Sequence, residues 1–218
     1  MLFSMFSNPI SFFFYIISLF IALSVHEASH ALAADKLGDP TPRLDGRITL
    51  NPLAHIDLSG LLFMLFFGFG WGKPVMFDPY NLKNPRKDAA LISLAGPASN
   101  FVLALVLSLL LRLFNIFDVS FLSSIGYIIF SPLITINLVL GIFNLLPIHP
   151  LDGFKIVGGL VNEDQAHEWF QLQRYGMIFL LLFIIPLGSS SMLDMVMQPI
   201  LKFVIPLFLP SLPGMGVI

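Results

Sequence analysis

Residues 10–34 read ISFFFYIISLFIALSVHEASHALAA, and this stretch decides the fold. Its first part, residues 10–25, contains no Asp, Glu, Lys or Arg and consists mainly of large apolar side chains. A bilayer core about 30 Å thick needs ~20 such residues in a helix. We therefore expect a transmembrane helix over about residues 10–34, with the sequence His26-Glu-Ala-Ser-His30 in its second half.

The same apolar pattern recurs along the chain. The ranges 89–111, 119–148 and 176–193 also lack Asp, Glu, Lys and Arg. Apolar residues make up 56% of the chain and charged residues 11%, against about 25% charged in a soluble domain. These features predict an all-α polytopic membrane protein with about five transmembrane helices, over residues 10–34, 89–113, 121–147, 175–188 and 192–209.

The 218 residues suit one membrane-embedded domain over 1–218, with a core at about 8–160 and C-terminal hydrophobic helices at about 170–210. The net charge of −2 gives no indication of a nucleic-acid partner. The chain contains no cysteine, which excludes disulfides and thiolate metal ligands.

A small membrane-associated β-hairpin with a re-entrant segment is predicted at about residues 43–78. Residues 47–50 alternate in polarity and 70–77 form a second candidate strand. The apolar range 58–70 is too short for an ordinary span, so we expect it to enter the membrane and return. This path collects nearly all basic residues on one face, which the positive-inside rule makes cytoplasmic: Lys36, Arg43, Arg47, Lys73, Lys83, Arg86, Lys87, Lys155 and Arg174.

The two histidines of the first helix have the spacing of a metal site. His26 and His30 are four residues apart, so their imidazoles lie on one helix face and can share one Zn²⁺. Glu27, between them, can act as a general base on the water that the metal activates. Two histidines and a glutamate are costly inside a membrane, which favours a functional site over a chance motif.

Asp152 is the best candidate for a third metal ligand, because it follows a long uncharged segment and precedes Gly153. It reaches the depth of His26 only if the first and third long spans run parallel, as the loop charge indicates. Asp45 lies in the same Leu-Asp-Gly tripeptide, but no span precedes it and a solvated turn is expected. His149 could line the site, and His55 could start a helix or support a ligand.

Several ordered motifs resemble the site-2 protease family of intramembrane zinc metalloproteases, over about residues 20–155. They are His26-Glu-Ala-Ser-His30, Ala95-Gly-Pro-Ala-Ser-Asn100, Asn144-Leu-Leu-Pro147 and Leu151-Asp152-Gly153. The sequences at 51–57 and 70–75 are similar to the short prokaryotic branch, without a PDZ or CBS domain. The resemblance implies His26, His30 and Asp152 as ligands of one Zn²⁺, Glu27 as the catalyst, and Asn144 and Pro147 near the substrate.

The expected function is hydrolysis of a peptide bond in or near a transmembrane segment of a membrane protein. Expected partners are that substrate and the lipid bilayer, in a prokaryotic cell membrane with the active site near the cytoplasmic face. Two alternatives are a catalytically inactive scaffold that binds transmembrane partners and a metal transporter. The sequence names neither the substrate nor the oligomeric state.

Overall fold

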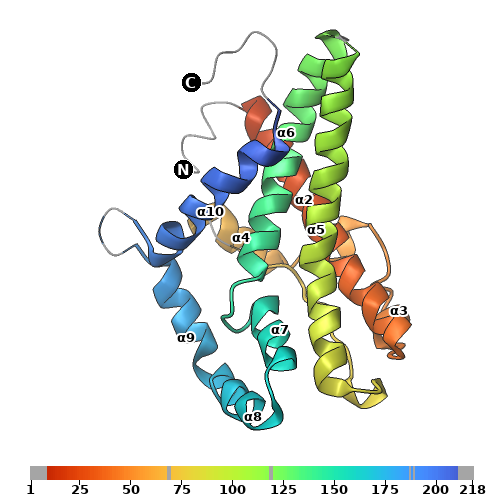
Figure 1. The fold of residues 1–218 in the computed structure, drawn as a ribbon, viewed down its shortest axis with the longest axis vertical. Coiled ribbons are helices and arrows are strands. Elements are labelled where there is room, and N and C mark those ends of the chain that lie inside the picture. The colour runs from red at the N-terminus through yellow and green to blue at the C-terminus, as the bar shows by residue number, and fades with distance from the viewer. Residues whose placement is uncertain (1–8, 68–69, 118–119, 187, 189, 211–218) are drawn as a thin grey trace.

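The structure, a computed structural model, describes residues 9–67, 70–117, 120–186, 188 and 190–210 (Figure 1). Three long helices dominate it: α2 (Pro9–Leu37), α5 (Pro85–Ile116) and α6 (Ser120–Asn144). Within the described residues, three helical segments are long and apolar enough to cross a membrane: Pro9–Leu37, Pro85–Ile116 and Ile125–Asn144. The three predicted long spans are therefore confirmed as helices.

Helix α5 is the centre of the packing and contacts α2, α6 and the short helix α7 (Asp152–Leu160). A buried apolar cluster joins α5 to α6: Ala104, Leu107, Leu111, Leu133, Ile134 and Leu138. Because lipid tails are as apolar as these side chains, the cluster stabilises the helix pair through close van der Waals packing. Because α2 also contacts α6, the three long helices form one bundle.

The shorter helices lie around this bundle. Helix α7, α8 (Glu163–Gln171) and the start of α9 (Gln173–Ile184) lie at the end where α6 ends and α5 begins (Figure 1). Helix α10 (Met192–Phe208) then returns to contact α6. Between α2 and α5 lie α3 (Thr41–Leu44), η1 (Pro52–Ala54), α4 (Leu58–Phe67) and η2 (Pro79–Asn81).

The prediction of five transmembrane helices is not supported. Helix α9 has 12 residues and α10 has 17, so at 1.5 Å per residue they are about 18 and 26 Å long. Both are shorter than the ~30 Å bilayer core. Helix α9 ends at Ile184, because Ile185 precedes Pro186 and a residue before proline is disfavoured in helical conformation. Ser191 then caps a new helix.

The predicted β-hairpin is also wrong for the residues that the structure describes, in which no strand forms. Residues 47–50 and 70–77 do not pair, and the region holds one isolated antiparallel bridge, between Ile56 and Gly72. Side chains, and not a second strand, form hydrogen bonds with the backbone N–H and C=O groups of residues 73–75. Arg47 donates to the carbonyls of Lys73 and Pro74, and the Val75 N–H donates to Glu27.

The segments before and after α4 nevertheless lie side by side. The Ile56–Gly72 bridge and a 2.8 Å hydrogen bond from the Lys73 N–H to the His55 carbonyl join the two flanks of this helix. Asp39 makes a second tie, since its carboxylate accepts hydrogen bonds from the Asp78 N–H and the Asn81 amide, at 2.7 Å each. Burial alone would raise the pKa of Asp39, but these hydrogen bonds and those from Thr41 hold it below its ordinary value.

Candidate metal centre

Helix α2 presents both histidines of the motif on the face that packs against α5. Both side chains are buried, and their rings meet edge to face at an interplanar angle of 88°, with centroids 4.6 Å apart. The Nε2 atoms of His26 and His30 lie 3.0 Å apart. The i, i+4 spacing has therefore brought two candidate ligand atoms to one point.

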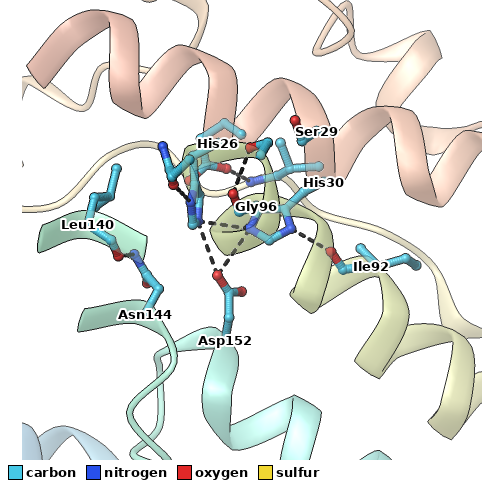
Figure 2. A network of polar contacts seen from close by, with 12 residues as sticks. His26, Ser29, His30, Ile92, Gly96, Leu140, Asn144 and Asp152 are labelled. Carbon is cyan, nitrogen blue, oxygen red and sulfur yellow. Dashed lines mark hydrogen bonds and ion pairs between the residues drawn. The ribbon is translucent and has the colours of Figure 1, made fainter. Parts of the chain in front are cut away.

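Asp152, the first residue of α7, is far from the histidines in sequence but lies at the same point in the structure (Figure 2). Its Oδ2 lies 3.1 Å from Nε2 of His26 and 3.2 Å from Nε2 of His30. The loop after α6 must fold back tightly to allow this. A Cβ at Gly153 would lie 2.3 Å from the Leu145 carbonyl oxygen, so only glycine fits beside Asp152.

Hydrogen bonds fix the tautomer of each imidazole. Nδ1 of His26 lies 2.7 Å from Oδ1 of Asn100, and Nδ1 of His30 lies 2.7 Å from the Ile92 carbonyl oxygen. Because both partners are acceptors, each Nδ1 carries a proton and donates it. Each neutral Nε2 then has a lone pair directed at the carboxylate of Asp152, so three electron-pair donors converge and require a cation between them.

The spacing of these donors fits zinc. Bonds of 2.0–2.1 Å in a tetrahedron give ligand atoms about 3.3 Å apart, close to the 3.0–3.2 Å that separates the three donor atoms. Asp152 would complete the set as an anionic oxygen donor beside two neutral imidazole nitrogens, a combination of ligands that zinc accepts.

A buried amide network supports His26 from two further helices. Asn100 of α5 accepts from His26 and donates to the Ala22 carbonyl at 3.0 Å and to Oδ1 of Asn137 at 2.8 Å. Asn137 of α6 in turn donates to the Leu133 carbonyl at 2.8 Å. Both asparagines are completely buried, and their hydrogen bonds tie the orientation of one candidate ligand to the packing of all three long helices.

We predict that Asn100→Leu lowers zinc affinity about 10- to 100-fold, the usual cost of losing a group that orients a metal-bound histidine. The variant removes the acceptor that keeps the proton on Nδ1 of His26. Affinity is measured in detergent by competition with a chelator. Asn115→Leu, in the same helix but near its C-terminal end, serves as the control and should bind zinc as the wild type does. Equal affinities for the two variants would contradict the role given to Asn100.

Helix α5 comes unusually close to the imidazoles at Gly96. A Cβ there would lie 2.4 Å from Nε2 of His30 and 2.7 Å from Cε1 of His26. Gly96 thus gives the two rings the space in which their Nε2 atoms meet.

Glu27 lies on α2 between the two histidines and is partly buried. Its Oε2 accepts a 3.0 Å hydrogen bond from the Val75 N–H, which belongs to the segment between α4 and η2. A cavity of about 700 Å³ lies beside it, within the range of ligand sites. Its lining is mostly apolar and comes from α2, α4, residues 70–74, the end of α6 and α9, with His26, Glu27 and Asn144 among the polar groups.

The other predicted site residues are less close to the three donor atoms. Asn144 ends α6 and lines the cavity, and its amide donates to the Leu140 carbonyl at 3.0 Å (Figure 2). Pro147 is exposed and does not line that cavity. Their substrate-binding roles stay predictions.

His55 and His149 lie outside the group of donors formed by His26, His30 and Asp152. His55 is completely buried, and its Nε2 contacts the Thr49 carbonyl oxygen at 2.8 Å. His149 packs edge to face on Phe154, and burial and the charge of Lys155 lower its pKa. A supporting role for either histidine stays a prediction.

Sequence reasoning assigned no role to Asn100, Asn137 or Gly96. Asn137 carried a usable signal, because an amide in an uncharged transmembrane segment is costly unless it has a partner. Asn100 and Gly96 belong to a motif on which the family resemblance was based, but that resemblance alone gave them no contact.

The comparison with known families decides the chain's membership. The sequence model of peptidase family M50 matches residues 14–185, which is more than half of the chain. The chain belongs to peptidase family M50, the site-2 proteases. The predicted family, the enzyme class of zinc metalloprotease and zinc as the cofactor are confirmed by this membership together with the relatives below.

Relatives of this M50 peptidase occur in bacteria and archaea. YwhC of Bacillus subtilis (strain 168), named as a zinc metalloprotease, is 40% identical over 204 residues, covering 90% of this chain and 93% of YwhC. Rip2 of Mycobacterium tuberculosis (strain ATCC 25618 / H37Rv), also so named, is 30% identical over 174 residues, covering 76% of this chain and 64% of Rip2. No solved structure matches the chain.

Proposed function

We propose that this M50 peptidase hydrolyses a peptide bond in or near a transmembrane segment of a membrane protein. One observation carries the proposal: the donor atoms of His26, His30 and Asp152 converge beside a mostly apolar cavity that Glu27 also lines. These three residues would hold one Zn²⁺ per chain, and Glu27 would be the general base. We further propose that residues 1–218 form a single domain.

When bound, Zn²⁺ supplies a Lewis acid that polarises a carbonyl and makes water nucleophilic near neutral pH. Glu27 accepts the proton that the attacking water loses and returns it to the leaving amine. Asn144, at the cavity wall beside Asp152, orients the substrate backbone with its amide. The apolar walls accept side chains that come from a transmembrane helix and exclude bulk water.

Neither alternative function has an observation in its favour. A metal transporter needs ligand groups at several depths, whereas the described residues hold a single group of three or more His, Asp or Glu side chains that could bind a metal. An inactive scaffold has no need of three converging donors with a carboxylate beside them. The protease function is therefore retained.

The substrate class can be tested with two single-span reporters in liposomes, one with an all-leucine span and one with a Gly-Pro pair at its centre. Helix carbonyls are all hydrogen-bonded, so cleavage requires local unwinding. The Gly-Pro pair lowers this cost by a few kcal/mol, and we expect cleavage at least about tenfold faster. A chelator should stop the reaction and added Zn²⁺ should restore it. Cleavage of a soluble protein such as casein at an equal rate would contradict an intramembrane substrate.

The orientation proposal places the active site near the cytoplasmic face of a prokaryotic cell membrane. The ties from Asp39 to Asp78 and Asn81 support it, because they hold the chain before α3 and the chain after α4 at one end of the bundle. Both flanks of α4 would then be cytoplasmic, and α4 would be re-entrant.

Cysteine labelling tests this topology without background, because the chain has no cysteine. We expect Lys36→Cys and Lys83→Cys to react with a membrane-impermeant maleimide only from the cytoplasmic side. Ile116→Cys, exposed at the other end of α5, should react from the opposite side. Labelling of Lys36→Cys and Lys83→Cys from opposite sides would make α4 part of a crossing and overturn the proposal.

A further inference from the structure

The segment of residues 72–77, here called the strap, passes over α2 beside Glu27. It has no regular secondary structure beyond the bridge between Gly72 and Ile56, and its Val75 N–H donates to Oε2 of Glu27 at 3.0 Å. The preceding residue, Pro74, lines the cavity together with Glu27. The strap is therefore the backbone element in direct contact with the proposed general base.

Arg47 fixes the strap from its other side. Its side chain is buried, with 6% of the residue exposed. The guanidinium donates to the carbonyls of Lys73 at 2.5 Å and Pro74 at 2.6 Å, and also to the carbonyl of Ala54. Within the described part of the chain no carboxylate lies within ion-pair distance of Arg47. A buried cation with only carbonyl partners is costly, and three charge-assisted hydrogen bonds offset that cost.

One peptide unit joins Arg47 to Glu27. The Pro74 carbonyl that accepts from Arg47 and the Val75 N–H that donates to Glu27 belong to the same planar trans peptide. In such a unit the C=O and the N–H point in opposite directions. Holding the oxygen against the guanidinium therefore directs the hydrogen at the carboxylate, and the cation on one end strengthens the donor at the other.

We propose that Arg47 is a positioning residue for the active site, which acts through the Pro74–Val75 peptide to hold the Glu27 carboxylate in one orientation. The proposal rests on the proposed role of Glu27 as general base. Oε2 is held by the strap, so Oε1 is presented in a fixed direction to accept the proton. Lysine cannot replace Arg47, because a single ammonium group lacks the planar fork that reaches three carbonyls.

The first test compares Arg47→Met with Arg43→Met in the full-length protein in liposomes. Methionine keeps an unbranched side chain in place but donates nothing, so the strap loses its anchor. Arg43, four residues earlier, is exposed, pairs with Asp35 and does not contact the strap, which makes it a matched control. We expect Arg47→Met to lower kcat about 10- to 100-fold, with KM changed less than about twofold and zinc affinity unchanged. Arg43→Met should match the wild type.

The second test removes the donor itself and does not depend on Arg47. Val75→Pro deletes the N–H that binds Glu27, whereas Val75→Ala keeps it and shortens the side chain. Val75→Pro should lose kcat to the same extent as Arg47→Met, and Val75→Ala should lose little. If Arg47→Met does not fold, the comparison of Val75→Pro with Val75→Ala tests the proposal without it. A wild-type kcat in Val75→Pro overturns the proposal.

A spectroscopic signal separates this proposal from the proposed function. In protein labelled with ¹⁵N-valine, the Val75 amide is assigned by its absence in Val75→Ala. We expect its proton resonance to move upfield in Arg47→Met as the hydrogen bond to Glu27 weakens, and to stay in place in Arg43→Met. If no membrane protein is ever cleaved but this shift is seen, the protease function fails and the Arg47–Glu27 coupling stands. An unmoved resonance, or loss of kcat only in proportion to lost zinc or folded protein, overturns the coupling.

Discussion

Glu27→Gln is expected to retain zinc and the fold but to lower proteolysis about 10²- to 10⁴-fold, the usual contribution of a general base. The amide has nearly the shape of the carboxylate, and its oxygen can still accept the 3.0 Å hydrogen bond from the Val75 N–H. What it cannot do is take a proton from the attacking water. The measurement is cleavage of a reporter in liposomes, beside zinc content by mass spectrometry.

The control for this variant is Glu168→Gln, which makes the same chemical change on the exposed surface of α8. It should cleave as the wild type does. Comparable turnover by Glu27→Gln in purified protein would remove Glu27 from the proton-transfer step. Loss of zinc from Glu27→Gln would show instead that Glu27 helps to bind the metal.

The second large effect is expected at Asp152. Asp152→Ala leaves two imidazoles at a site that needs three protein ligands, so both zinc binding and activity should be lost. Removing a group that only orients a ligand costs about 10- to 100-fold in affinity, and removing the ligand itself should cost more. Zinc per chain is measured after gel filtration against a chelator, and proteolysis is measured on the same samples.

Asp45→Ala is a matched control, because Asp45 lies in the same Leu-Asp-Gly tripeptide as Asp152. Asp45 is exposed at the end of α3, away from the three converging donor atoms. The Asp45 variant should retain both zinc and activity. A reversed result, with zinc lost from Asp45→Ala and kept in Asp152→Ala, would overturn the assignment of the third ligand.

The convergence of His26, His30 and Asp152 was predictable because each step rested on helix geometry or charge. The spacing of the histidines predicted that they share one helix face. The distribution of basic residues among the loops predicted that the first and third spans run parallel. Parallel spans bring Asp152 to the depth of the histidines. What the sequence could not provide was the rotation of α5 and α6 about their axes, on which the contact between Asn100 and His26 depends.

The failed β-hairpin has a different physical cause. Alternating polarity at residues 47–50 is typical of a strand, and Arg47 was expected among the loop charges of the cytoplasmic face. In the structure the Arg47 side chain is buried and binds the carbonyls that a ladder would need. Sequence patterns record which residues are polar, but not which of them donate to the backbone of a distant segment.

The two last helices show a further limit. Two separate crossings were predicted, over residues 175–188 and 192–209, and the structure does break the chain between them, but α9 and α10 have only 12 and 17 residues. Hydrophobicity averaged over a window does not register where a helix ends, because prolines and glycines are tolerated within apolar segments.

The distance along the chain between the ligands has a consequence for biosynthesis. His26 and Asp152 are 126 positions apart, and α5 and α6 both lie between them. A nascent chain that has inserted only α2 carries Glu27 and both histidines but only two of the three proposed metal ligands. With that ligand set it would not hold zinc tightly and would not cleave neighbouring membrane proteins while it is being made. Activity would begin only when α7 has packed against α5, so the order of synthesis itself would act as the safeguard.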